Sequence, residues 1–126
     1  MTEIVLEGPG KNALSPELMD RVLATLRQSF GAPVLLTGSG DAFSAGLDLK
    51  ALGKMDPSSL ETYLRKLEAL VETLYTYPGP TVAAVNGHAI AGGCVLALCC
   101  DFQVITDQPK VKYGLNELAL GLQFPH

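Results

Sequence analysis

The segment from Asn86 to Leu96 is the first place where the chain could do chemistry. It reads Asn-Gly-His-Ala-Ile-Ala-Gly-Gly-Cys-Val-Leu, and its paired glycines, Gly92 and Gly93, open an apolar, helix-like run directly after a strand-like one. The first turn of a helix has N–H groups without intrahelical partners, and the helix dipole adds partial positive charge there. Because glycine has no side chain to block a ligand, this junction favours a negative charge lying close to the main chain.

A second glycine-rich junction lies upstream. Residues 38–49 read Gly-Ser-Gly-Asp-Ala-Phe-Ser-Ala-Gly-Leu-Asp-Leu and also follow a strand-like run. Two such junctions can face one site. If the N–H of Leu47 and the N–H of Gly92 converge, they form a two-donor hole for an oxyanion, in which each donor is worth on the order of 3 kcal/mol in the transition state.

Alternating strand-like and helix-like segments must position these junctions. Strands are predicted at residues 3–7, 34–37, 81–85 and 102–106. Helices are predicted from Pro16 to Phe30, from Ser58 to a point before Pro78, and from Gly92 to Cys100. Strands that alternate with helices favour parallel pairing, so the pattern indicates an α/β fold whose recurring units suggest turns of a spiral.

The first two helices have predicted caps and buried stripes. Ser15 is expected to cap the first, and Ser58 with Glu61 forms a capping-box pattern for the second. The stripe of the first helix comprises Leu18, Met19, Val22, Leu23, Leu26 and Phe30. The stripe of the second comprises Leu60, Leu64, Leu67, Leu70, Val71 and Leu74.

Composition limits the classes of function. The 126 residues suffice for one domain, and a chain that is 48% hydrophobic and 17% charged is expected to bury much of its surface or to have a partner surface. A net charge of −4 without a basic run argues against nucleic-acid binding. The first residues lack signal-peptide features and charges interrupt each candidate membrane span, so we expect no membrane association and a cytoplasmic or matrix-side location.

Other reactive side chains give weaker signals. Cys94, Cys99 and Cys100 share one apolar run, so they are expected to pack as small hydrophobic residues without a disulfide, in preference to a nucleophilic role for Cys94. His88 is expected to fill space or bond to the backbone. No cluster of His, Cys, Asp and Glu has metal-ligand spacing, so no metal is expected.

Four segments, in order, closely resemble the crotonase family, also called the enoyl-CoA hydratase/isomerase family. The segments are Asn12–Ser15, Phe43–Leu49, Ala84–Cys94 and Tyr113–Glu117. Four ordered matches along essentially the whole chain are far more specific than one glycine-rich motif. The resemblance implies a spiral of ββα turns and an acyl-CoA substrate, without a further cofactor, whose thioester oxygen lies between the N–H groups of Leu47 and Gly92.

The resemblance also assigns substrate-binding positions. Ala45, Gly46, Asp48 and Leu49 match the family segment that lies along the CoA moiety and its adenine end, and Gly93 joins Gly92 on the substrate side. From the residues themselves, Asp48 could equally cap a helix or tie a loop. Lys11 and Lys50 could reach CoA phosphates or be solvated surface lysines.

Two positions favour one reaction of the family. The glutamate that positions and activates water in the hydratases is replaced by Val95, which cannot hold or deprotonate water. The second family glutamate is retained as Glu117, although without the resemblance this residue would be interpreted as a surface glutamate. One carboxylate beside an oxyanion hole suits proton shuttling, so the Δ3,Δ2-enoyl-CoA isomerase branch is the closest match, with Glu117 as acid and base.

Family members run considerably longer than this chain. Residues 1–126 therefore match the N-terminal part of an acyl-CoA-binding domain, truncated at its C-terminal end, and the chain is expected to be a fragment, to combine with a second chain or to assemble unusually. The resemblance implies a homo-oligomer, a trimer or hexamer, unless a complementary chain supplies the rest. The alternatives are a non-catalytic or partner-dependent acyl-CoA-binding subunit, and another one-carboxylate reaction such as hydrolysis or decarboxylation.

Overall fold

Two parallel sheets organise residues 1–114, the part of the chain that the computed structural model describes. The main sheet has the order β1-β2-β4-β6 and consists of β1 (Thr2–Leu6), β2 (Val34–Gly38), β4 (Thr81–Val85) and β6 (Phe102–Ile105). The smaller sheet has the order β3-β5-β7 and consists of β3 (Ala42–Ser44), β5 (His88–Ile90) and β7 (Tyr113–Gly114). Each neighbouring pair in both sheets is parallel, which confirms the α/β prediction.

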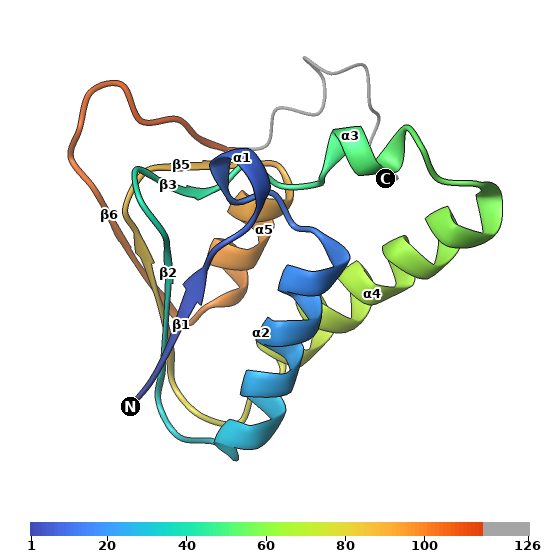
Figure 1. Cartoon of the computed structure of the whole chain (residues 1–126). Helices are drawn as coiled ribbons and strands as arrows, with labels where there is room; N and C mark the ends of the chain where they lie inside the picture. The colour runs from blue at the N-terminus through green and yellow to red at the C-terminus, as the bar shows by residue number, and fades with distance from the viewer. Residues whose placement is uncertain (115–126) are drawn as a thin grey trace, which may run out of the picture.

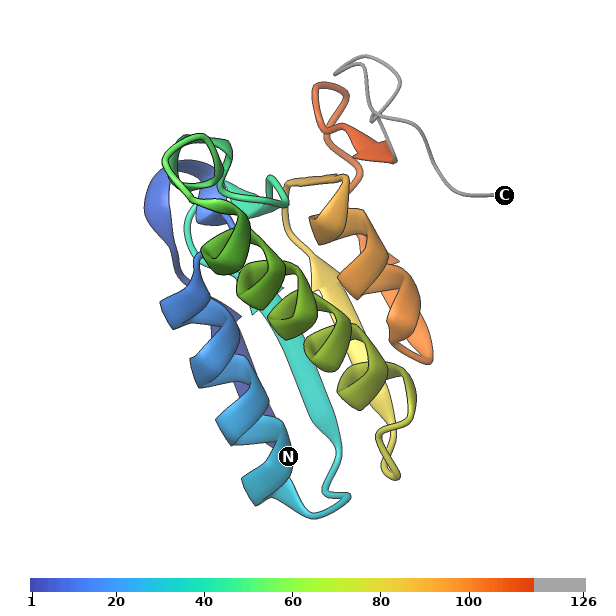
Figure 2. The same cartoon turned by 90° about the vertical axis from the view of Figure 1, so that its right-hand side faces the viewer.

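Three helices cover one face of the main sheet. These are α2 (Pro16–Ser29), α4 (Pro57–Tyr75) and α5 (Gly92–Cys99). They lie next to one another over the sheet, as Figure 1 and Figure 2 show from two directions. Two short helices, α1 (Pro9–Asn12) and α3 (Leu49–Leu52), lie near the smaller sheet, at the top of the view in Figure 1.

The chain repeats one unit, in which a main-sheet strand leads into a small-sheet strand and then into a helix. β2 is followed by β3, α3 and α4, and β4 is followed by β5 and α5. This is the ββα turn that the family resemblance implies. The strands β3 and β5 themselves have three residues each, too few to show a period in sequence, and they replace what reads as loop.

The core lies between the main sheet and the three covering helices. Alternate strand residues point into it, as expected for a sheet with one covered face. The buried strand residues are Ile4, Leu6, Val34, Leu36, Ala83 and Val85. The helices supply Leu18, Met19, Val22, Leu23, Leu26, Tyr63, Leu70, Leu74, Leu96 and Ala97. Within residues 1–114 no helix is both long enough and apolar enough to cross a membrane.

The end of α2 departs from the sequence prediction. Ser15 caps this helix as predicted, because its hydroxyl accepts a hydrogen bond from the Leu18 N–H at 3.2 Å. The prediction for Phe30 is wrong, since the helix ends at Ser29 and Phe30 takes a left-handed conformation with φ 48° and 90% of its surface exposed. The left-handed turn directs this side chain away from the stripe.

The predicted start and stripe of α4 are also corrected. Asp56 caps the helix by accepting a 2.7 Å hydrogen bond from the Ser59 N–H, whereas the predicted capping box places Ser58 there. Glu61 instead pairs with Arg65 at 2.8 Å on the outer face. The buried stripe is set by Tyr63, Leu70 and Leu74, with Leu67 packed against it.

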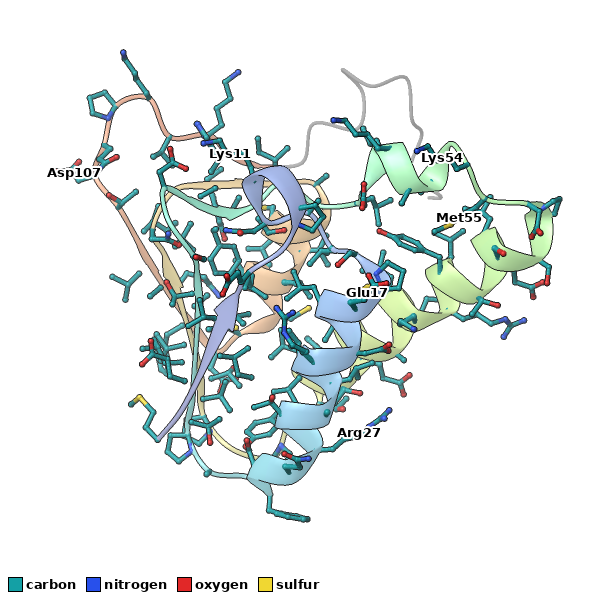
Figure 3. The ribbon with its side chains drawn as sticks, in the orientation of Figure 1. Lys11, Glu17, Arg27, Lys54, Met55 and Asp107 are labelled. Carbon is teal, nitrogen blue, oxygen red and sulfur yellow. The ribbon has the colours of Figure 1, made fainter. Side chains whose placement is uncertain are left out.

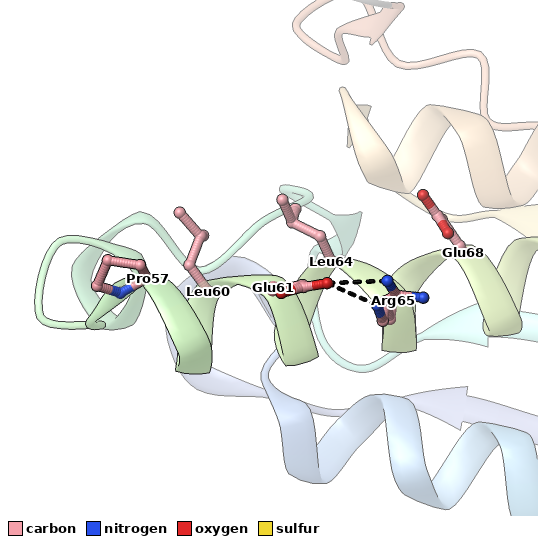
Figure 4. A pocket seen from close by; sticks show the side chains of 6 residues that line it. All are labelled: Pro57, Leu60, Glu61, Leu64, Arg65 and Glu68. Atoms are coloured by element: carbon pink, nitrogen blue, oxygen red, sulfur yellow. Dashed lines mark hydrogen bonds and ion pairs between the residues drawn. The ribbon is translucent and has the colours of Figure 1, made fainter.

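An open groove runs along the outer face of α4. Leu64, predicted to be buried, is 41% exposed in this groove. Figure 4 shows the six lining side chains, which are Pro57, Leu60, Glu61, Leu64, Arg65 and Glu68. The prediction placed Leu60 and Leu64 in the stripe because they lie two turns and one turn before Leu67, at helical spacing.

The main sheet lacks a cover on its second face within residues 1–114. Phe102 and Val104 on the edge strand β6 are each 65% exposed, and Val5 on β1 is 42% exposed. Parallel sheets are usually covered on both faces, so these side chains form an apolar surface that is unusual for a parallel sheet. The composition predicts such a surface for a chain this apolar.

Candidate functional site

The two glycine junctions are in contact. A Cβ atom built on Gly46 would lie 2.9 Å from the Gly92 nitrogen and 2.9 Å from the Ile90 oxygen. A Cβ on Gly93 would lie 2.2 Å from the Ser44 oxygen. Real Cβ atoms do not approach backbone that closely, and Gly46 also has φ +88°. Glycine is therefore required at both positions for the segment after β3 to pack on the start of α5.

The peptide between Gly46 and Leu47 has a fixed orientation. The Gly46 oxygen accepts a hydrogen bond from the Leu14 N–H at 2.7 Å. In a trans peptide the N–H points opposite to the C=O, so the Leu47 N–H faces away from Leu14. Among residues 1–114 this N–H donates to no other group, whereas the N–H groups before and after it both have acceptors.

Those neighbouring N–H groups are both engaged by side-chain hydroxyls. The Gly46 N–H donates to Ser44 Oγ at 3.1 Å. The Asp48 N–H donates to the hydroxyl of Tyr63 at 3.1 Å. Leu47 thus offers a backbone donor between two N–H groups that are held by hydrogen bonds.

The second outward donor is the Gly92 N–H, the first of α5. The Ala91 N–H donates to the Gly114 oxygen at 3.0 Å, and the Ala91 oxygen accepts from the Val95 N–H at 3.0 Å. The Ala91–Gly92 peptide is therefore aligned with α5, and its N–H points out of the helix start. No acceptor within residues 1–114 takes a hydrogen bond from it.

Ala91 has a strained backbone beside this donor. Its φ of 52° and ψ of −119° form a conformation that residues with a side chain rarely adopt. Such conformations cost of order 1–3 kcal/mol and persist where the surroundings fix them. Here the surroundings are the two hydrogen bonds of Ala91 and the close approach of Gly46.

Two asparagines hold the loop that enters the site. The Asn86 amide donates to the oxygens of Gly38, Gly40 and Ala42 at 3.0–3.2 Å, and its oxygen accepts from the Gly38 N–H at 2.9 Å. Asn12, which is 5% exposed, donates to the Ala42 oxygen at 2.9 Å. The β2–β3 connection is therefore fixed to β4 and to α1.

Sequence reasoning did not assign these supporting roles. Ser44 is fully buried, and its hydroxyl donates to the Asn12 oxygen at 2.7 Å while accepting from Gly46. Asn12, Ser44 and Asn86 all lie inside the segments quoted for the family resemblance. A polar residue in a motif otherwise made of glycine and apolar residues is the signal that could have found them.

One ion pair and one histidine lie near the site. Lys11, on α1 (Figure 3), contacts both carboxylate oxygens of Asp41, at 2.7 and 3.0 Å. This hydrogen bond and the lysine charge lower the pKa of Asp41 below its usual value, although both side chains are exposed. The Nδ1 atom of His88 accepts from the Lys112 N–H at 2.8 Å, so this histidine bonds to the backbone, as predicted.

Comparison with known proteins decides the family. The model of the family described as "Enoyl-CoA hydratase/isomerase" matches residues 1–125. The chain belongs to the enoyl-CoA hydratase/isomerase family. The resemblance drawn from the four sequence segments is therefore confirmed.

Relatives in this family have names on both sides of the reaction choice. A mitochondrial enoyl-CoA delta isomerase 1 from Mus musculus is 38% identical over 125 residues, which cover 95% of this chain and 43% of that protein. A putative enoyl-CoA hydratase from Thermus thermophilus is 44% identical over 118 residues, which cover 88% of this chain and 46% of that protein.

A solved structure confirms the crotonase fold. The crystal structure of an enoyl-CoA hydratase from Bacillus anthracis superposes with a TM-score of 0.84 and 30% identity, covering 95% of this chain and 48% of that chain. The chain thus spans about half the length of the relatives it matches, and less than half of these three proteins. The described strands and helices correspond to the N-terminal part of the hydratase/isomerase fold.

The remaining predicted positions of this enoyl-CoA hydratase/isomerase family member are distributed around the two junctions. The Ala45 N–H donates to the Lys11 oxygen at 2.9 Å. Asp48 caps α3 by accepting from the Ala51 N–H at 3.2 Å, and Leu49 begins that helix with 54% of its surface exposed. Asp48 therefore has a structural role as the cap of α3.

Of the two positions that favour one reaction, Val95 lies within the described residues and Glu117 does not. Val95 lies in the first turn of α5 and is half-buried, on the same helix as Gly92. Glu117 lies outside the described residues. Within residues 1–114, no group of three His, Cys, Asp or Glu side chains could hold a metal ion.

Proposed function

We propose that this chain is part of an acyl-CoA enzyme that isomerises 3-enoyl-CoA to 2-enoyl-CoA. The observation that carries the proposal is the contact between Gly46 and Gly92, flanked by two outward N–H groups. The thioester oxygen would accept hydrogen bonds from the N–H groups of Leu47 and Gly92. Such paired donors stabilise charge that develops on a carbonyl oxygen and need no metal or redox cofactor.

Glu117 would carry the proton in this reaction. Its carboxylate removes a proton from the carbon next to the thioester carbonyl, and the electrons of that C–H bond form a dienolate whose charge rests on the thioester oxygen. The resulting carboxylic acid returns the proton to the carbon two positions further along. The double bond thereby moves from the third to the second carbon, and the glutamate recovers its ionised form.

Val95 supports isomerisation over hydration. A valine side chain can neither donate nor accept a hydrogen bond, so it cannot hold an attacking water. Its position in the first turn of α5 is one turn from Gly92. The name of the mouse relative agrees with isomerisation, whereas the Thermus name is that of a hydratase.

The segment from Ala45 to Leu49 would lie along the CoA moiety. It runs from β3 past the Leu47 donor into α3, and Gly93 follows Gly92 on α5. Lys11 forms an exposed ion pair with Asp41, and such pairs contribute little to stability, so the pair would oppose a move of the lysine to a CoA phosphate only weakly. The proposal assigns the backbone of this segment, and not Lys11, to the contact with CoA.

The test is turnover of a 3-enoyl-CoA by the chain and by Glu117→Gln. We expect Glu117→Gln to reduce turnover at least 100-fold, since an amide cannot shuttle the proton. Glu68→Gln, on the outer face of α4, is the matched control and is expected to retain full activity. Equal turnover by Glu117→Gln and the parent chain would contradict the role of Glu117, and detection of a thioester cleavage product or carbon dioxide would favour hydrolysis or decarboxylation.

A second candidate function is a non-catalytic or partner-dependent acyl-CoA-binding subunit. The observation that favours it is the apolar surface of Val5, Phe102 and Val104 on a chain that spans about half the length of its relatives. Calorimetric titration with hexanoyl-CoA distinguishes the two functions. Binding without turnover favours the subunit. The value of the native mass then distinguishes a single chain from a trimer, a hexamer or a complex with a complementary partner.

A further inference from the structure

Tyr63 connects the long helix α4 to the segment that carries the Leu47 donor. Its side chain is 2% exposed, and its hydroxyl makes two hydrogen bonds at once. It donates to the Leu14 oxygen and accepts from the Asp48 N–H, the latter at 3.1 Å. The hydroxyl thus bridges two backbone segments that lie 34 positions apart in the sequence, 14 and 48.

Hydrogen bonds hold the peptide groups on both sides of Leu47. On one side, the Leu14 N–H donates to the Gly46 oxygen at 2.7 Å, and Leu14 forms an isolated parallel bridge with Leu47. On the other side, Tyr63 holds the Asp48 N–H. Each contact limits rotation of one peptide plane, and together they leave the Leu47 N–H pointing away from Leu14.

We propose that Tyr63 is a positioning residue for the Leu47 donor. Its hydroxyl holds Leu14 and Asp48 at a fixed separation, so that the Leu47 N–H is directed at a ligand oxygen before the ligand arrives. The nature of that oxygen, a thioester carbonyl, rests on the proposed function. The positioning itself follows from the contacts of Tyr63.

If Tyr63 only stabilised the fold, its loss would lower stability without changing the orientation of the Leu47 N–H. Removing a buried hydroxyl leaves its backbone partners without a hydrogen bond and lowers stability wherever it occurs. Tyr77, just after α4, offers the matched case, because its hydroxyl donates to the Ala32 oxygen at 2.6 Å, in the connection between α2 and β2 rather than at the Leu47 segment. Both variants remove a hydrogen bond from a tyrosine hydroxyl to a backbone oxygen, and only Tyr63→Phe also removes the acceptor of the Asp48 N–H in the donor segment.

The first measurement needs no ligand. Amide hydrogen exchange, resolved by NMR on the full chain, is compared for the parent, Tyr63→Phe and Tyr77→Phe. We expect exchange of the Asp48 amide to accelerate at least tenfold in Tyr63→Phe and the Leu47 amide resonance to shift, with neither change in Tyr77→Phe. Parent-like Asp48 exchange and Leu47 shift in a folded Tyr63→Phe would overturn the proposal.

The second measurement reads the donor directly. Hexanoyl-CoA with a 13C-labelled thioester carbonyl is added to each variant, and the carbonyl stretch is followed by isotope-edited infrared spectroscopy. We expect a shift to lower frequency on the parent and on Tyr77→Phe, and less than half of that shift on Tyr63→Phe. An equal shift on Tyr63→Phe overturns the positioning role.

The two measurements separate this inference from the proposed function. Absence of a carbonyl shift on the parent contradicts thioester binding between Leu47 and Gly92, and the Asp48 exchange still decides whether Tyr63 orders the segment. Parent-like exchange in Tyr63→Phe together with a normal carbonyl shift on the parent contradicts the role of Tyr63 and leaves the thioester site intact.

Discussion

Gly46 lies so close to Gly92 that a Cβ atom at position 46 would lie 2.9 Å from the nitrogen of Gly92. We therefore predict that Gly46→Ala destabilises the protein and disrupts the candidate site. The positive φ of +88° contributes about 1–3 kcal/mol of strain, and the contact with fixed backbone atoms adds a similar amount. Urea unfolding measures the change in the free energy of unfolding.

Gly40→Ala is the matched control for this substitution. Gly40 has φ +72°, and a Cβ atom there would have no neighbour within 4 Å, so this variant carries the backbone strain without the clash. We expect Gly46→Ala to be the less stable of the two by about 1–3 kcal/mol. Equal losses would show that the close approach of the two junctions is not maintained in solution.

Ala91→Gly should stabilise the protein. Relief of the strain at φ 52° and ψ −119° returns about 1–3 kcal/mol, and the greater freedom of glycine in the unfolded chain offsets about 0.5–1 kcal/mol of it. Ala89→Gly, on the neighbouring strand with an ordinary φ, is the control and should lower the stability. A decrease in the melting temperature of Ala91→Gly as large as that of Ala89→Gly would contradict the strained backbone.

Much of the scaffold is predictable from the sequence because it depends on short-range patterns. Alternating strand residues, the Ser15 cap and the strand 81–85 all appear where their local chemistry places them. Phe30 and Leu64 fail because helical spacing does not reveal where a helix ends or which of two overlapping stripes faces the sheet. Those outcomes depend on the left-handed turn at Phe30 and on packing between α2 and α4.

The candidate site also contains residues that the sequence could predict and one that it could not. Gly46, Gly92 and Gly93 could be found from sequence because they lie in glycine-rich segments that follow predicted strands, and glycine in such segments is typical of a backbone that approaches another segment closely. Tyr63 could not, because its partners Leu14 and Asp48 are distant in sequence and offer only backbone groups. Its place at the start of the buried stripe with Leu70 and Leu74 accounts for its burial but not for its hydroxyl contacts.

Asn86→Asp should open the loop between β2 and β3. The variant keeps the oxygen that accepts from the Gly38 N–H but replaces an amide that donates to three carbonyl oxygens with a carboxylate. Three acceptors without their donor lower stability by about 1–3 kcal/mol or more. Urea unfolding measures the loss, with Gln103→Glu as control, because that amide also donates to two carbonyls but lies at the other end of α5. A loss no larger than that of the control would contradict the bracing role of Asn86.

The ion pair between Lys11 and Asp41 should make a small, pH-dependent contribution to stability. The lysine lowers the pKa of Asp41 below its usual 3.8, so the contribution is present when the carboxyl is ionised in the unfolded chain and is lost as the pH falls through the lowered pKa. We expect the stability difference between the parent and Asp41→Asn to be constant near neutral pH and to vanish in acid. Urea unfolding at several pH values measures it, and a difference that grows in acid would contradict the pairing.

Cys100 should make the folded protein sensitive to alkaline pH. Burial raises the pKa of its thiol from 9.0 to about 11, so the unfolded chain ionises this thiol first. Stability is then complete below pH 9 and decreases by on the order of 1–3 kcal/mol as the pH rises toward 11. Urea unfolding of the parent and of Cys100→Ala at pH 8 and pH 10 checks this, because the variant lacks the thiol and should lose less stability over that interval.

The same raised pKa leaves about one Cys100 thiol in a thousand ionised at pH 8. A disulfide reagent should therefore modify Cys100 slowly in the native protein and rapidly in urea. Fast native modification, or equal alkaline losses in both proteins, would show that the thiol is not buried as described.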